Sequence, residues 1–309
     1  MYKTKKGYFY SPSDLTIFMS SPFASWMNRY ALDNHDHELE KDEADSLMSV
    51  LAQKGYEHED VFEAKLIKDG LEVVKIDVGN NKEKLVATKE AMKQGVDVIT
   101  QARLEAEPFA GFADFLIKVP GDSQLGDYYY EVWDTKLSRT AKSSHIIQLC
   151  CYAEMLLTLQ GRLPEKIAVA LGNGESKVLF TNEYFDYYLQ LKNQFLLQQA
   201  EFSSTEFPDP ASSNSWGDWS EVAKTILVEQ DHLILVANIR TTQIKKLTKA
   251  GINTVTNLVE TKQESIAGLN DTIFHRLKSQ ARLQKASDCL LYTSPSPRDQ
   301  RGSRMPSSA

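Results

Sequence analysis

The chain is poor in cysteine and has no long hydrophobic run. Only three of its 309 residues are cysteines, too few for the disulfide framework of a small secreted protein. No stretch of about 18 apolar residues occurs, which argues against a membrane span. The basic residues 1–6 are followed by residues 7–12, where a signal peptide would carry its apolar core. We therefore expect a protein of the reducing cytoplasm that neither is secreted nor crosses a membrane.

The composition is that of a globular chain with an uneven charge. Hydrophobic residues make up 42% and charged residues 25%, and the length allows one large domain or two ordinary ones. The formal net charge is −7, yet residues 239–286 hold nine Lys or Arg against three Asp or Glu. This distribution predicts an acidic body joined to a basic module.

The C-terminal segment differs from the rest of the chain. Residues 289–299 and 303–309 resemble the translation of sequencing-adapter DNA, and neither stretch has a hydrophobic period. A natural Ser/Pro-rich tail is the alternative. We expect residues 289–309 to be a non-native tail without fold information, and the natural protein to continue beyond position 288.

Hydrophobic periodicity predicts an α/β fold over residues 1–207. A helix is expected to begin within residues 11–15, and a turn is expected at residues 120–122. Leu47, Val50, Leu51, Tyr56 and Val61 recur at helical spacing, which predicts a long helix that Gly70 ends. Further helices are predicted over residues 42–68, 82–94, 144–160 and 185–202, and strands over residues 71–78, 96–105, 109–119, 128–137, 166–171 and 177–181.

A Pro/Ser/Asn-rich break starts at residue 208, so residues 208–236 are expected to form a linker and residues 237–288 a small helical module. Residues 244–258 read as a helix, a tight turn and a second helix. Their pattern resembles a helix-hairpin-helix, which offers backbone N–H groups to DNA phosphates. Alternatively, the basic residues form a solvated helical face and the glycine only ends a helix. The DNA-binding candidates are Lys245, Lys246, Lys249 and Gly251.

Four residues of the first domain suggest a metal site. Asp114 lies in a strand between apolar neighbours, Asp134 and Lys136 share one face of another strand, and His58 lies in a helix. Carboxylates hold Mg²⁺ or Mn²⁺, and such an ion lowers the pKa of bound water. Lys136 would orient that water beside a phosphate. A plain Asp134–Lys136 ion pair and a solvated His58 are the alternatives.

In their order along the chain, these motifs resemble the RecB-like branch of the PD-(D/E)XK nuclease superfamily. That branch has a helical His, a Gly-x-x-Asp strand, an acid-x-Lys strand and a Gln-x-x-x-Tyr helix, over about residues 8–286 here. The resemblance implies a restriction-endonuclease-like core, a small mixed sheet flanked by helices, followed by the helix-hairpin-helix-like module. It implies catalysis by Asp114, Asp134 and Lys136, metal binding by His58, Asp114, Asp134 and Thr135, and substrate contact or support by Gln148 and Tyr152.

One feature of the RecB-like branch is absent from the sequence. Many members hold an iron–sulfur cluster on four cysteine thiolates. Here Ser20 and Ser21 precede Pro22, and residues 208–238 contain no cysteine. Cys150 and Cys151 fit better as small buried apolar residues. We therefore expect no cluster.

The expected function is a Mg²⁺- or Mn²⁺-dependent deoxyribonuclease within a larger protein of DNA repair or processing. Its partner would be single-stranded or duplex DNA, and the resemblance implies C-terminal nuclease or helicase domains that this chain lacks. The alternative is a catalytically inactive nucleic-acid-binding module. The sequence leaves open DNA against RNA and endonuclease against exonuclease action.

Overall fold

The computed structural model describes residues 1–5, 7–34, 39–43, 46–213 and 215–291. They fall into two compact units, Met1–Trp219 and a second that begins at Ser220. The predicted adapter tail lies outside the described residues, except that residues 289–291 continue the last helix. No helix within the described ranges is long and apolar enough to cross a bilayer.

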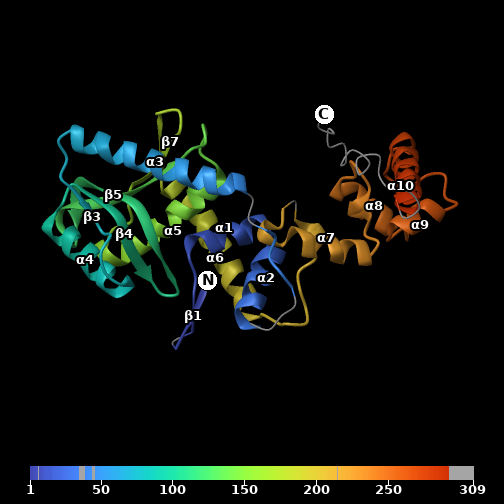
Figure 1. Cartoon of the computed structure of the whole chain (residues 1–309), viewed down its shortest axis with the longest axis horizontal. Helices are drawn as coiled ribbons and strands as arrows, with labels where there is room; N and C mark the ends of the chain where they lie inside the picture. The colour runs from blue at the N-terminus through green and yellow to red at the C-terminus, as the bar shows by residue number, and fades with distance from the viewer. Residues whose placement is uncertain (6, 35–38, 44–45, 214, 292–309) are drawn as a thin grey trace, which may run out of the picture. The chain divides into compact units, whose positions relative to one another are not determined.

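The first unit is built on a six-stranded mixed sheet of order β3-β4-β5-β6-β7-β8, part of which is visible in Figure 1. The β3–β4 and β6–β7 pairs are parallel and the remaining neighbours are antiparallel. The predicted mixed α/β class is therefore confirmed. The strands are β3 (Val73–Lys75), β4 (Val98–Ala106), β5 (Phe109–Ser123), β6 (Gly126–Lys136), β7 (Lys166–Leu171) and β8 (Ser176–Phe180), and a short hairpin of β1 (Tyr2–Thr4) and β2 (Gly7–Phe9) precedes them.

The helices of this unit agree closely with the sequence prediction, apart from one that was not predicted separately. Ser11 caps the first helix through a reciprocal capping box with Asp14. A second helix follows at once, capped by Ser21. The helices are α1 (Pro12–Ser20), α2 (Pro22–Asp33), α3 (Ser46–Lys68), α4 (Asn81–Gln94), α5 (Ser143–Gln160) and α6 (Asn182–Ala200).

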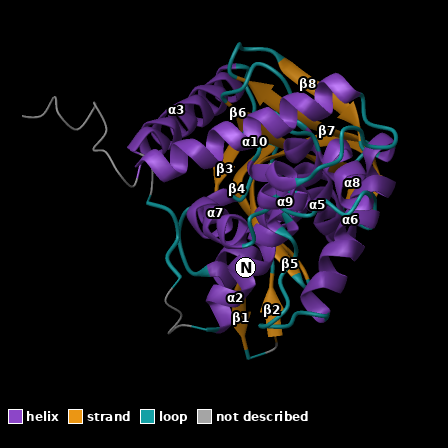
Figure 2. Cartoon of the chain, turned by 90° about the vertical axis from the view of Figure 1, so that its right-hand side faces the viewer, coloured by secondary structure: helices purple, strands orange, loops and turns teal. Residues whose placement is uncertain are grey.

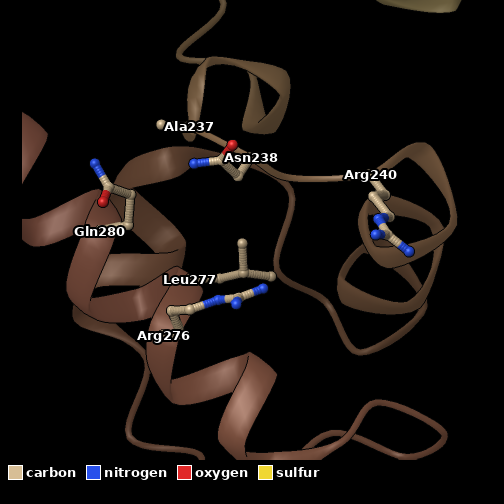
Figure 3. Close-up of a pocket in the computed structure, with 6 residues that line it drawn as sticks. All are labelled: Ala237, Asn238, Arg240, Arg276, Leu277 and Gln280. Carbon is tan, nitrogen blue, oxygen red and sulfur yellow. The ribbon is translucent and has the colours of Figure 1, made fainter.

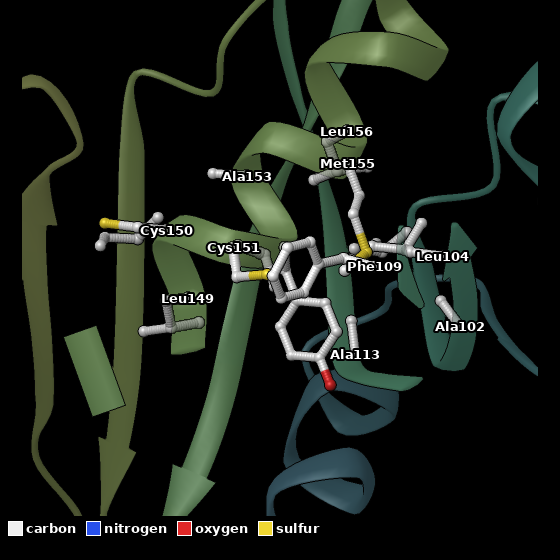
Figure 4. Packing of buried hydrophobic residues seen from close by; sticks show 14 of the residues in the cluster. Ala102, Leu104, Phe109, Ala113, Leu149, Cys150, Cys151, Ala153, Met155 and Leu156 are labelled. Atoms are coloured by element: carbon white, nitrogen blue, oxygen red, sulfur yellow. The ribbon is translucent and has the colours of Figure 1, made fainter. Parts of the chain in front are cut away.

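The main core lies on the sheet face that α5 covers. Apolar residues of α5 pack against strand residues such as Ala102, Leu104 and Ala113 in a cluster of buried side chains, seen from close by in Figure 4. Burial of this continuous apolar surface is the main favourable term in folding. It also fixes α5 rigidly against β4, β5 and β6.

Helix α3 packs on the opposite face, with α5 and α6 on the other side of the strands (Figure 2). Phe62 and Leu66 are buried there, and the ring of Phe62 meets that of Phe115 edge-on at 5.0 Å. The apolar residues whose spacing predicted this helix do not form its buried face, because Val50, Leu51, Tyr56 and Val61 are all exposed. Neighbouring helical residues point about 100° apart, so burial of Phe62 turns Val61 towards solvent.

Two strand predictions also need correction. The strand expected over residues 71–78 reduces to Val73–Lys75. The turn expected at residues 120–122 lies inside β5, which continues to Ser123 with a register irregularity between Pro120 and Ser123. A bulge accommodates the Pro and Gly in this strand without ending it.

The second unit is helical and has its own core. Apolar residues including Leu233, Leu247, Leu258 and Phe274 form a separate buried cluster. The segment expected as a linker contains short helical turns and a full helix, because residues 220–229 are amphipathic enough to form one. The helices are α7 (Ser220–Glu229), α8 (Thr241–Lys249), α9 (Val255–Glu260) and α10 (Asp271–Leu291).

Two separate cores predict separable losses of stability. Phe274 is completely buried, so Phe274→Ala should lower the free energy of unfolding of the second unit by about 3–5 kcal/mol. Hydrogen exchange read by mass spectrometry should show the loss in α8–α10 while β4–β7 keep their protection. Phe195→Ala, in the core of the first unit, is the matched control with the opposite pattern. Equal loss in both units from either change would contradict two independent cores.

Candidate functional site

The two predicted catalytic carboxylates lie where β5 and β6 separate. The β5–β6 ladder runs to the pair Phe115–Trp133 and stops there. Continued by one residue, this antiparallel register would put Asp114 opposite Asp134. Beyond that point β5 pairs with β4 from Ala113 to Phe109 and makes one bridge to Tyr10, whereas β6 pairs with β7. The two aspartates therefore meet at a place where two neighbouring strands end their pairing.

The β4–β5 ladder is irregular at the same level. Gln101 has a positive φ of 53°, and the Gln101–Asp114 pair is missing from an otherwise continuous register. Ile99 and Ala102 lie three residues apart, yet both join the core on the α5 side, whereas a regular strand would turn them to opposite faces. A local irregularity of this kind redirects side chains and is common near functional sites. Asp114 lies opposite this irregularity in the β4–β5 register.

Asp114 is held by β6 across the separation. Its Oδ2 accepts hydrogen bonds from the Thr135 backbone N–H at 3.0 Å and from Thr135 Oγ1 at 3.3 Å. Thr135 was predicted as a metal ligand, and the contacts that the structure shows for it are those of a donor to Asp114. These two bonds fix the carboxylate beside Asp134.

Asp134 and Lys136 share one face of β6, as the period of two predicts. Lys136 Nζ lies 2.6 Å from Asp134 Oδ2, which makes the two side chains an ion pair. Asp134 is only 2% exposed. Burial raises its pKa well above the usual value, the charge of Asp114 raises it further, and Lys136 opposes both effects.

His58 is held away from Asp134 in the described structure. His58 belongs to α3, the helix on the sheet face opposite α5. Its Nε2 lies 3.3 Å from the carbonyl oxygen of Ala170 in β7. Val132 packs in the core on the α5 side and Trp133 on the α3 side, so strand alternation turns Asp134 towards α5. The role of His58 as a ligand remains a prediction.

Glu59 is a site residue that the sequence reasoning missed. It is half-buried on α3, and its carboxylate accepts a hydrogen bond from the side chain of Gln101. Burial raises the pKa of Glu59, and the charge of Asp114 raises it further, although Gln101 opposes this. Glu59 lies three residues before the buried Phe62 and so shares its helix face, but the sequence alone does not show which face of α3 is buried.

Tyr152, on α5, supports the β5 backbone through a hydrogen bond. Its hydroxyl donates to the Phe112 carbonyl oxygen at 2.5 Å, and Gln148 lies beside that hydroxyl. Gly111 makes room for the ring, because a Cβ there would lie 2.9 Å from ring atoms of Tyr152. Burial raises the pKa of Tyr152, and the charges of Asp114 and Asp134 add to this. The Gly-x-x-Asp and Gln-x-x-x-Tyr motifs thus contact each other directly.

His145, at the start of α5, is a second residue that the sequence reasoning missed. Its Nδ1 accepts from the Lys142 backbone N–H at 3.3 Å. Burial lowers the pKa of His145 to about 4, with smaller contributions from the charges of Lys136 and Lys142. A neutral imidazole therefore stands near Lys136 at neutral pH.

The donor set is compatible with one oxygen-preferring cation. Among the described residues no three His, Cys, Asp or Glu side chains converge as a preformed metal cage. Mg²⁺ usually takes only one or two carboxylates and keeps several waters, so Asp114 and Asp134 meet its usual requirement. Asp134 Oδ2 is paired with Lys136 Nζ at 2.6 Å, so a bound cation would share this oxygen with the ammonium group or displace it. Cys150 and Cys151 are buried, which raises the pKa of each thiol to about 12.

Helices α8 and α9 of the second unit follow each other along the chain, and the helix-hairpin-helix-like role of this segment stays a prediction. Gly251 lies between α8 and α9 with a positive φ of 81° and open space around its Cβ position. Lys245 and Lys249 are exposed and have no ion-pair partner among the described residues. Lys246, in contrast, donates to the carbonyl oxygen of Gly268, which ties α8 to a later loop.

Comparison with known proteins gives no relative: no protein-family model matches the chain, and no curated protein has a matching sequence. The resemblance to RecB-like nucleases therefore rests on the sequence motifs alone.

The Asp134 environment predicts a gain of stability on removal of its charge. A raised pKa means that the folded state disfavours the ionised form, so stability is lost as pH rises above the ordinary Asp range. Asp134→Asn should raise the free energy of unfolding at pH 7 without metal by about 1 kcal/mol or more, while the partly exposed Lys136 turns to water. Urea denaturation at pH 7 and pH 4 should show the gain only at pH 7.

The matched control is Asp127→Asn, an exposed position on the same strand, which should leave stability unchanged. If Asp134→Asn lost stability at pH 7 while Asp127→Asn did not, the idea that the Asp114 and Asp134 charges repel each other in the folded protein would be contradicted.

Proposed function

We propose that the first unit is a Mg²⁺- or Mn²⁺-dependent nuclease domain that hydrolyses DNA phosphodiester bonds. The observation that carries this proposal is the Asp114–Asp134 pair beside Lys136, where two strands separate. A purely structural ion pair would not need a second carboxylate held against it. Buried like charges are instead typical of sites that bind a cation or move protons.

The residues of the site have separable roles in such a reaction. A bound Mg²⁺ or Mn²⁺, held by Asp114 and Asp134, would supply a water of lowered pKa and neutralise phosphate charge. Thr135 holds the Asp114 carboxylate in place through two hydrogen bonds. Lys136 then places a positive charge where the phosphate and the attacking water meet. Tyr152 and Gly111 fix the β5 backbone that carries Asp114.

Glu59 adds a third acid at the edge of this site. Its carboxylate is near enough to Asp114 to have its pKa raised by that charge. A carboxylate at this distance can accept hydrogen bonds from waters on the cation, which is how outer groups orient a metal site. We therefore include Glu59 among the residues that support the reaction.

The second unit would hold the nucleic acid through its phosphates. Lys245 and Lys249 supply charge that has no internal partner within the described residues, and the Gly251 turn leaves open space beside the backbone, although the Gly251 and Ile252 N–H groups already donate to the Thr248 and Leu247 carbonyl oxygens. Contacts of this kind are independent of base sequence and weaken with salt.

A second candidate is a nuclease fold that only binds nucleic acid. Two observations favour it: Lys136 is already paired with Asp134, and no three-ligand metal cage exists among the described residues. In that case DNA would bind in any metal and remain intact.

Substitution of the carboxylates separates the two candidates. Asp114→Asn keeps side-chain volume and removes a ligand charge, so cleavage should fall by several orders of magnitude, about 4 kcal/mol or more of barrier. Lys136→Ala should act similarly, whereas His58→Ala and Glu59→Gln should be equal or milder. The measurement is cleavage of single-stranded and duplex DNA in Mg²⁺, Mn²⁺ or EDTA, with binding measured at fixed salt.

Asp127→Asn is again the matched control and should cleave as the wild type does. DNA affinity should survive in every variant, because phosphate contacts in the second unit supply much of it. Cleavage that persists in Asp114→Asn or in EDTA would refute the metal-site assignment, and binding without cleavage in the wild type would favour the second candidate.

A further inference from the structure

The second unit contains a cavity outside the hairpin. It has a volume of about 350 Å³ and is lined by Ala237, Asn238, Arg240, Arg276, Leu277 and Gln280 (Figure 3). The buried Leu277 forms an apolar floor. Ala237, Asn238 and Arg240 come from the loop before α8, and Arg276 and Gln280 come from one face of α10. None of the six lining residues belongs to the predicted DNA-binding residues.

The charge of this cavity is entirely positive. Arg240 and Arg276 line it, and no Asp or Glu does. Neither guanidinium has a hydrogen-bond or ion-pair partner among the described residues. Other basic residues of the unit are engaged internally: Lys285 pairs with Asp231 at 3.1 Å, and Lys278 donates to the Thr261 carbonyl oxygen. The two arginines are thus part of the charge that the fold itself leaves unused.

The walls of the cavity are held in place. Gln284 of α10 accepts from the Ala237 backbone N–H at 2.9 Å and donates to the Leu235 carbonyl oxygen at 2.8 Å, which ties the loop to the helix. Asn238 adopts a positive φ of 63° in this loop, a conformation that Asn tolerates better than most residues. A site of this kind needs little rearrangement to bind.

The helix wall presents its two polar groups together. Arg276 and Gln280 are one turn apart on α10, so they share a face. Figure 3 shows the guanidinium of Arg276 directed towards the side of the cavity where Arg240 stands. Arg240 immediately precedes the first turn of α8, whose free N–H groups add partial positive charge.

We propose that this cavity binds a phosphate group, carried by a nucleic-acid strand or by a free nucleotide. The planar guanidinium binds phosphate through two parallel N–H···O bonds, and two of them can take opposite sides of one group. The Asn238 amide can donate to the remaining oxygens, as can the second amide hydrogen of Gln280, whose Nε2 also donates to Gln284 Oε1 at 3.3 Å. The inference rests on the proposed function only for the nucleic-acid source, since the cavity itself is independent of the cleavage site.

The test places a negative charge in the cavity without removing either arginine. Gln280→Glu should fill the site with a carboxylate that pairs with Arg276, and it also removes the hydrogen bond from Gln280 to Gln284. Gln230→Glu, an exposed position in the same unit, makes the same chemical change outside the cavity. Arg276→Gln removes one guanidinium and guards against a fold defect in Gln280→Glu. Thermal melting of all three full-length variants checks that the second unit stays folded.

Binding is measured in EDTA, so that cleavage plays no part. One arm follows a fluorescent oligonucleotide by anisotropy over a range of salt, and the other follows a radiolabelled mononucleotide by equilibrium dialysis. We expect Gln280→Glu and Arg276→Gln to weaken oligonucleotide binding at least tenfold, and Arg276→Gln to lower the salt slope by about 0.7–0.9. Gln230→Glu should change affinity less than twofold.

Loss of oligonucleotide binding in the cavity variants identifies a strand phosphate, and loss of mononucleotide binding alone identifies a free nucleotide. The proposal is overturned if neither ligand binds, or if Gln280→Glu weakens binding no more than Gln230→Glu. Failure of the nuclease proposal gives a different result: the wild-type protein binds DNA but leaves it uncleaved in Mn²⁺.

Discussion

Two carboxylates of like charge, Asp114 and Asp134, are held together where β5 and β6 end their pairing, and the surrounding structure maintains this arrangement. Ionised groups in a buried position are unfavourable unless they are paired. Here Thr135 binds one carboxylate and Lys136 partly neutralises the other. The raised pKa of Asp134 shows that this compensation is incomplete. Such local destabilisation is common where a protein must bind a ligand tightly.

The packing on the two sheet faces explains which residues can reach this pair. Helix α5 packs under the strands and brings Tyr152 against β5, close enough that Gly111 can have no side chain. Helix α3 packs over the other face through Phe62 and Leu66, which places Glu59 at the edge of the site and directs His58 towards β7. The irregularity at Gln101 lies in the sheet between α3 and α5. In a regular β4–β5 ladder, Asp114 would face only one of these two helices.

The sequence predicted the elements better than their faces. Strand alternation was enough to put Asp134 and Lys136 together, because the period of two is a backbone property. The buried side of α3 could not be read, since apolar residues occur on several sides of that helix and only contact with the sheet selects Phe62. The Gln101 irregularity, the role of Glu59 and the internal engagement of Lys246 all depend on tertiary contacts. The helix at residues 220–229 was not predicted, because the Pro/Ser-rich composition that starts at residue 208 indicates a linker over the whole of residues 208–236.

Binding of Mn²⁺ tests the central claim most directly, because it reads the carboxylate pair without any requirement for catalysis. Electron paramagnetic resonance of free Mn²⁺ during titration at neutral pH gives the number of ions bound per chain. The account predicts one ion on the wild type and on Asp127→Asn, and none at the same concentration on Asp114→Asn or Asp134→Asn. A wild type that binds no Mn²⁺, or variants that keep the ion, would contradict it.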